Sequence, residues 1–209
     1  MDKPALLRGA AAPVHDLLTL VTPDRLTAPT PCTEFDVRAL LNHVLTWGPV
    51  LEAAARKEPA APAEPTATNP AGTNPAAAFG EQLQRIVAAW SEQEAWEGST
   101  TMGGPDPMPA ALIGGMVVSE IVVHGWDLGR AIGRSPSWDP AVLEFVLGEV
   151  TATAGLGRGM GIYADAVPVP GSAPVLDRLL GVTGRDPQWV RNARSTATGI
   201  DTGAEAREP

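Results

Sequence analysis

Cysteine is almost absent from this chain, since only Cys32 among its 209 residues is a cysteine. A single cysteine cannot form an internal disulfide. This excludes the small secreted proteins that disulfides hold together. We therefore expect a cytoplasmic protein.

Basic residues are too few for a protein that binds nucleic acid. The chain has 15 lysines and arginines against 24 aspartates and glutamates, a formal net charge of −9, and no run of five basic residues. Its sequence pI is about 4.8. Binding to a phosphate backbone requires a basic face. We expect no nucleic-acid partner.

Long hydrophobic runs are missing from the N-terminal stretch MDKPALLRGAAAPVHDLL, where Asp16 interrupts the best candidate. A signal peptide or a membrane-spanning helix needs a longer uninterrupted apolar segment. We therefore expect neither feature and no membrane partner. Hydrophobic residues nevertheless make up 44% of the chain, enough for the core of a globular domain.

Helical periodicity accounts for most of the chain, and no segment alternates as a strand would. Four long amphipathic segments predict an all-α protein built on a four-helix bundle. They are Pro4 to Val21, Val37 to Lys57 with Asp36 as N-cap, Pro75 to Trp96, and Met108 to Ile132.

Two further helices are expected after the four long ones. Asp139 reads as the N-cap of a helix that continues to about Thr153. After an irregular segment, a short helix follows at Val175 to Leu180. Residues 1–193 form one domain in this interpretation, with a Pro/Ala-rich loop at 58–74. Residues 194–209 are small and polar and are expected to be a disordered tail.

The segment SEIVVHGWDLGR at 119–130 places polar groups on an apolar helix face. At about 100° per residue, Glu120 and His124 fall within about 40° of Ile113. Asp127 lies on the same side. Burying unpaired carboxylates costs several kcal/mol, so such a group needs a partner, a charge or a metal ion.

Two explanations of this spacing stay open on the residues alone. A glutamate and a histidine four residues apart can grip one divalent ion, and His43 on the inner edge of another long helix could be a third ligand. Three protein ligands with an open position are typical of catalytic metal sites. The other explanation is a hydrogen-bonded buried pair of Glu120 and His124.

Three more residues have two possible roles each. Asp127 could orient a ligand histidine, or lie on the helix surface paired with Arg130. His15 could be a fourth ligand, although it lies beside the apolar stripe of its helix. Cys32 lies in a proline-rich turn without a basic neighbour, so we favour a structural thiol over a nucleophile.

Arginines and tryptophans offer weaker candidates for binding a substrate or cofactor. Arg130, Arg134 and Arg158 could hold an anionic group, although most helical arginines are solvated. Trp47 and Trp126 could line a pocket, although a tryptophan in a bundle more often packs in the core.

Two motifs in order resemble a known family. PTPCTEFDVRALLNHV, followed about 75 residues later by SEIVVHGWDLGRAIG, resembles the mycothiol-dependent maleylpyruvate isomerase N-terminal-like proteins. These form an actinobacterial branch of the DinB superfamily of metal-binding four-helix bundles. The later stretch VPVPGSAPVLDRLLGVTGRDPQW also resembles this family. The resemblance covers about residues 5–190.

This resemblance implies one divalent ion held by His43, Glu120 and His124. Zinc is the first choice, with nickel, iron or manganese as alternatives. It also implies a low-molecular-weight thiol such as mycothiol as cosubstrate, an electrophilic small molecule as substrate, and an S-transferase or isomerase reaction. The protein is expected to be a monomer or a homodimer.

Alternatives to that function are a metal-dependent hydrolase with Asp127 as base, or a non-catalytic metal-binding scaffold. Two departures from the family also stand out. Phe35 occupies a position where many relatives have tryptophan. The isomerase itself is expected to carry an additional C-terminal domain, whereas this chain is expected to end soon after the bundle.

Overall fold

The computed structural model describes residues 2–61, 74–159 and 161–191. The expected disordered tail at 194–209 and most of the loop expected at 58–74 lie outside this part of the chain. The elements run in the order α1 (Lys3–Leu18), η1 (Pro23–Arg25), α2 (Val37–Arg56), α3 (Pro75–Ala89), η2 (Gln93–Trp96), β1 (Ser99–Thr100), β2 (Met108–Pro109), α4 (Ala110–Ala131), α5 (Pro140–Gly159) and α6 (Val175–Val182).

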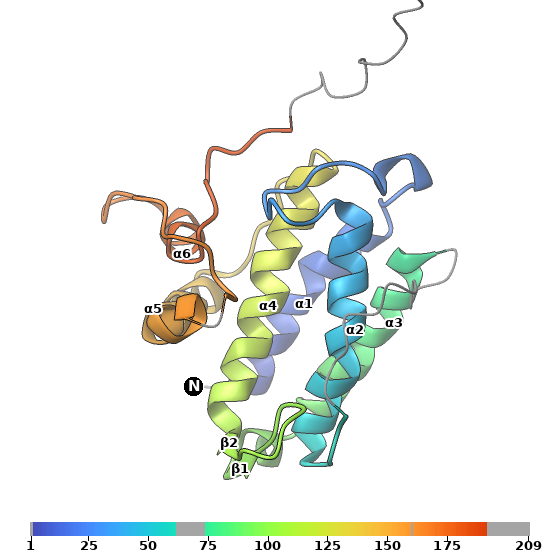
Figure 1. Ribbon diagram of the computed structural model, residues 1–209, viewed down its shortest axis with the longest axis vertical. Coiled ribbons are helices and arrows are strands. Elements are labelled where there is room, and N and C mark those ends of the chain that lie inside the picture. The colour runs from blue at the N-terminus through green and yellow to red at the C-terminus, as the bar shows by residue number, and fades with distance from the viewer. Residues whose placement is uncertain (1, 62–73, 160, 192–209) are drawn as a thin grey trace, which may run out of the picture.

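Helices α1 to α4 form a closed bundle, as Figure 1 shows. Helix α4 packs against α1 and α2, and α3 packs against the same two helices from the other side. Helix α5 lies outside the bundle against α4 and α1, and α6 packs on α5. The prediction of an all-α, DinB-like four-helix bundle with an additional short C-terminal helix is confirmed.

Capping side chains fix where several helices begin. Asp36 accepts a hydrogen bond from the backbone N–H of Ala39 at 2.8 Å, which confirms it as the N-cap of α2. Asp139 accepts one from Ala141 at 2.8 Å at the start of α5. These starts could be predicted because the cap lies beside the helix in the sequence.

The ends of α3 and α5 differ most from the predicted ones, by seven and six residues. Helix α3 ends at Ala89 instead of reaching Trp96, since the Trp96 indole donates to the carbonyl of Trp90 at 2.9 Å and satisfies the end of the helix. Helix α5 continues past Thr153 through a glycine-rich stretch. Its Gly157 packs so closely on Tyr163 that a Cβ there would lie 2.6 Å from the ring.

Helix α4 is enclosed by its neighbours and has 17 of its 22 residues buried. By length and composition it is the one described helix apolar enough to cross a membrane, yet 72% of that stretch is buried inside the protein. Its apolar surface is therefore used in packing against α1, α2 and α5. Polar side chains on this helix enter a protein interior.

Candidate metal centre

Helices α2 and α4 lie side by side and bring the three expected ligands together. His43 lies about two turns into α2, while Glu120 and His124 lie one turn apart in the middle of α4. One ligand atom from each side chain can be chosen so that all lie within 4.8 Å of one another. The bundle thus creates a cluster of two imidazoles and one carboxylate.

The spacing within this cluster fits a shared ion. Oε2 of Glu120 lies 3.2 Å from Nε2 of His124 and 3.8 Å from Nε2 of His43. A charged hydrogen bond between such groups would be about 2.7–2.9 Å long. Ligand atoms about 2.0–2.1 Å from a tetrahedral zinc ion lie about 3.3 Å apart. The donor set and its spacing therefore fit a divalent ion.

Aromatic contacts hold the ring of His43. Its centroid lies 5.2 Å from that of His124, with the rings nearly edge-on at 70°. On the other side, the ring of Phe35 lies 5.0 Å away. Phe35 therefore packs against one member of the cluster.

The cluster is buried on one side and open on the other. His124 is only 9% exposed, whereas the side chains of His43 and Glu120 are 29% and 34% exposed. Glu120 therefore lies at the edge of the core, although the sequence placed it on the core-facing side of its helix together with His124. Solvent or a small ligand can reach the cluster past these two side chains.

Two small cavities border the cluster. One of about 30 Å³ is lined partly by His43, Trp47, Glu120 and Phe79. The other, of about 20 Å³, is lined by Ser119, Glu120, Val123, His124, Ile162, Tyr163 and Arg185. Each has room for about one or two water molecules. Trp47 therefore does lie beside the cluster.

Asp127 lies behind His124 and is completely buried. Its Oδ2 atom is 3.1 Å from Nδ1 of His124 and 3.1 Å from a terminal guanidinium nitrogen of Arg185. The alternative of a surface aspartate paired with Arg130 is therefore wrong. The contact with Nδ1 leaves Nε2 of His124 pointing toward Glu120, as a ligand nitrogen must.

The electrostatics of the cluster are set by its carboxylates. Burial alone would lower the pKa of His124, but Glu120 and Asp127 outweigh burial and raise it to about 9. Burial would raise the pKa of Glu120, but His124 and His43 hold that pKa far below its usual range. Without an ion, Glu120 is thus a carboxylate at neutral pH and His124 is protonated.

Arg185 is the residue of this region that the sequence interpretation missed. It is 7% exposed, contacts Asp127, and donates from its other terminal nitrogen to the carbonyl of Thr183 at 3.0 Å. It lies in the stretch GRDPQW, and Gly184 before it has a φ of 81°. The sequence signal that could have drawn attention to Arg185 is the Gly184-Arg185 pair, which lies between apolar segments.

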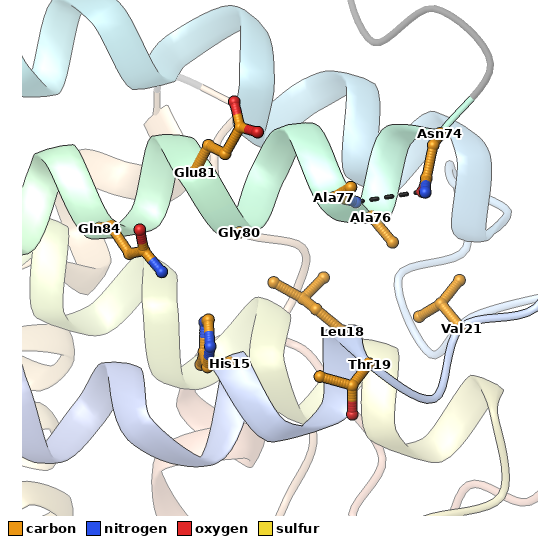
Figure 2. Close-up of a pocket in the computed structure, with 10 residues that line it drawn as sticks. All are labelled: His15, Leu18, Thr19, Val21, Asn74, Ala76, Ala77, Gly80, Glu81 and Gln84. Carbon is orange, nitrogen blue, oxygen red and sulfur yellow. Dashed lines mark hydrogen bonds between the residues drawn. The ribbon is translucent and has the colours of Figure 1, made fainter.

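His15 lies away from the cluster. Figure 2 shows it on α1, in a groove of about 340 Å³ between α1 and α3 that Glu81 and Gln84 also line. This face of α1 is turned to α3, whereas the cluster lies between α2 and α4. His15 is therefore not placed to be a fourth ligand.

The arginines proposed as anion-binding groups have other partners or positions. Arg130 donates to the carbonyl of Trp189, and its guanidinium carbon lies 5.9 Å from the centroid of the Trp126 ring. Arg158 donates to the carbonyl of Val182 at 3.0 Å. Arg134 is exposed and lines a groove beside α1. The guanidinium that borders the cluster belongs to Arg185.

Trp126 is 4% exposed and packs in the core, as most bundle tryptophans do. Cys32 is half-buried and unpaired, and burial raises the pKa of its thiol. A raised pKa disfavours the thiolate form that a nucleophile needs.

Comparisons with known proteins agree with this architecture. The family model described as the mycothiol maleylpyruvate isomerase N-terminal domain matches residues 7–129. Two uncharacterized proteins of Mycobacterium tuberculosis, from strains CDC 1551 / Oshkosh and H37Rv, are each 30% identical over 176 residues. Those alignments cover 81% of this chain and 90% of each relative.

The fold is also similar to that of a crystallised mycothiol-dependent maleylpyruvate isomerase. The TM-score is 0.62, with 16% sequence identity and 89% of each chain covered. A histidine-to-alanine variant of that enzyme matches with a TM-score of 0.62, 15% identity and 88% of each chain covered. Because the match covers 89% of the isomerase chain, little of that chain is left for the additional C-terminal domain that we expected it to have beyond the matched part.

Proposed function

Because this chain belongs to the family of the mycothiol maleylpyruvate isomerase N-terminal domain, we propose that it is a metal-dependent enzyme with a small thiol as cosubstrate. The reaction is an isomerisation or an S-transfer, and mycothiol is the proposed thiol. The observation that carries the proposal is the convergence of His43, Glu120 and His124 beside small cavities and solvent.

The proposed metal ligands are the Nε2 atoms of the two histidines and the carboxylate of Glu120. Zinc suits this donor set, and nickel, iron or manganese can use the same ligands. A bound divalent ion lowers the pKa of a thiol ligand, so that the sulfur is a thiolate at neutral pH. Three protein ligands would leave such an ion able to bind one further ligand, such as the sulfur of a thiol.

The charges around the cluster favour an anionic ligand. With both histidines neutral, Glu120 and Asp127 supply two negative charges, while Arg185 and a divalent ion supply three positive ones. One positive charge therefore remains in a partly buried site. A thiolate neutralises it, whereas a neutral thiol does not.

The side chains around the cluster restrict what else can enter. Trp47 and Phe79 line one small cavity, and Ile162 and Tyr163 line the other. These apolar walls limit the water near the sulfur. In an isomerisation, the thiolate would add to an electron-poor carbon of a substrate double bond, whose π electrons move onto the electron-withdrawing group. After rotation about the resulting single bond, the sulfur leaves as thiolate and the double bond forms again. In a transfer, the thiolate would instead displace a group that leaves the carbon with the electron pair of its bond.

The metal content of purified protein is the first test. We expect about one equivalent of divalent metal in the wild type and in His15→Ala, which removes a histidine outside the cluster, but none in His124→Ala. Elemental mass spectrometry measures this directly. If His124→Ala keeps its metal, or the wild type binds none after reconstitution, the proposed metal centre is wrong.

A thiol assay tests the reaction itself. Metal-loaded wild type is incubated with mycothiol and a panel of electrophilic substrates, and loss of free thiol or isomerised product is followed. We expect turnover that requires both mycothiol and metal. Turnover without added thiol would instead favour another reaction class.

The alternatives have less support in the geometry. A hydrolase would need Asp127 as base, but this carboxylate is fully buried, and its Oδ2 atom contacts both His124 and Arg185. A closed scaffold site would need a fourth protein ligand, and His15 lies in a different groove. The partial exposure of His43 and Glu120 favours a site that admits a substrate.

A further inference from the structure

The segment after α6 passes directly behind the metal centre. Gly184 allows this path, because a Cβ at that position would lie 2.7 Å from the Cβ of Ala164. The next residue, Arg185, enters the protein interior and borders the cavity that Glu120 and His124 also line. Arg185 lies outside residues 7–129, the range that the family model matches.

One oxygen atom connects this segment to the metal centre. Oδ2 of Asp127 lies 3.1 Å from Nδ1 of His124 and 3.1 Å from the terminal nitrogen of Arg185. The other terminal nitrogen of Arg185 donates to the Thr183 carbonyl at 3.0 Å. One terminal nitrogen of the guanidinium is therefore fixed by a backbone carbonyl while the other binds the Asp127 carboxylate. Both Asp127 and Arg185 are buried.

Stability alone does not account for this buried pair. Oδ1 of Asp127 and Nε of Arg185 are buried without a hydrogen-bond partner among the described residues. Buried ion pairs with unsatisfied atoms are often no more stabilising than apolar side chains of similar size. The pair does, however, fix the orientation of a carboxylate that contacts a candidate ligand.

Attachment of the C-terminal segment does not depend on this pair. Arg158 of α5 donates to the carbonyl of Val182, and Arg130 of α4 donates to the carbonyl of Trp189. The first bond holds the end of α6 and the second holds the segment after it, each through a backbone carbonyl, and neither reaches Asp127. Of these three arginines, Arg185 is the one whose guanidinium contacts Asp127, the aspartate beside His124.

We propose that Arg185 is a positioning residue for the metal centre. It fixes Asp127, which orients the imidazole of His124 so that Nε2 faces the ion. This proposal rests on the proposed function in that it requires the cluster to bind a divalent cation. It assigns to the C-terminal segment a part of the site that the bundle alone does not supply.

Zinc and cobalt binding test the proposal independently of enzyme activity. Zinc affinity is measured by competition with a chromophoric chelator, and the visible absorption spectrum of the cobalt-substituted protein reports ligand geometry. We expect Arg185→Met to weaken zinc binding about 10- to 100-fold and to change the cobalt spectrum. Arg185→Lys keeps the charge and should recover part of the affinity.

Arg158→Met is the matched control, since it removes a guanidinium bond to the carbonyl of Val182, at the end of α6 and three residues before Arg185, without touching Asp127. We expect it to keep wild-type zinc affinity and the wild-type cobalt spectrum. If Arg185→Met fails to fold, Asp127→Asn removes the same charge interaction with little change of shape. We expect it to weaken zinc binding by a similar factor.

The outcomes separate this inference from the proposed function. Wild-type affinity and an unchanged cobalt spectrum in folded Arg185→Met would overturn the positioning role and leave the metal centre intact. An equal loss of affinity in Arg158→Met would also overturn it, because the effect would then be a general loosening of the segment. A wild type that binds no zinc overturns both proposals, whereas one that binds zinc but shows no thiol chemistry overturns the enzyme function alone.

Discussion

His124 contacts two carboxylates, with one ring nitrogen facing Glu120 in the cluster and the other facing Asp127 behind it. Its position could be predicted from sequence because Glu120 and His124 are one helical turn apart. The role of Arg185 could not be predicted in this way, because Arg185 lies 58 residues from Asp127 in the chain and the two side chains meet only in the folded protein. Local spacing identifies ligands on one helix better than it identifies their distant partners.

Protonation of His124 gives a test at the residue scale. Because the neighbouring carboxylates raise its pKa to about 9, this imidazole holds a proton at pH 7 that a metal ion must displace. We expect zinc binding to release about one proton at pH 7 and less at pH 10, above that pKa. Calorimetric titration in buffers of different ionisation enthalpy measures the number released. Identical enthalpies in all buffers at pH 7 would contradict this.

Cys32 provides a second residue-scale test. Because burial raises the pKa of its thiol, the thiolate fraction at pH 7.5 should be smaller than that of a free cysteine. We expect iodoacetamide to modify native Cys32 several-fold more slowly than the same residue in urea-unfolded protein. Mass spectrometry of timed samples gives the rates. Faster alkylation in the native state would revive the nucleophile interpretation.

At the scale of elements, the starts of the helices were easier to predict than their ends. Asp36 and Asp139 mark helix starts through bonds to residues two or three positions away. The end of α3 depends on indole hydrogen bonds, and the extension of α5 depends on the close packing of Gly157 against Tyr163. Tertiary contacts of this kind leave little trace in a local pattern.

Close packing of α4 on α1 predicts a large effect of one methyl group. A Cβ at Gly125 would lie 2.4 Å from Cγ2 of Val14, so Gly125→Ala should reduce the free energy of unfolding by about 1–3 kcal/mol. Urea unfolding followed by circular dichroism measures the change.

The comparison for this variant is Gly148→Ala on the exposed face of α5, where nothing lies within 4 Å of the added carbon. There alanine should increase stability by about 0.5–1 kcal/mol, because it favours the helix more than glycine does. Equal effects at the two sites would refute the close-packing argument.

At the scale of the whole molecule, the proposed metal centre joins residues of α2 and α4, two helices that meet only in the folded state. An ion that binds only the native protein stabilises it by about 2.7 kcal/mol at a free concentration 100 times its dissociation constant. For a protein of this size, removing zinc with a chelator should lower the melting temperature by about 5–10 °C. Differential scanning fluorimetry measures the shift, and His124→Ala should show none.

The position of Arg185 in the chain also sets an order of events during synthesis. His43, Glu120 and His124 leave the ribosome before Arg185, because they precede it in the chain. A nascent chain therefore contains all three residues of the cluster before it contains the arginine that pairs with Asp127. Under the role proposed for Arg185, tight retention of an ion would begin only once translation has passed the segment after α6.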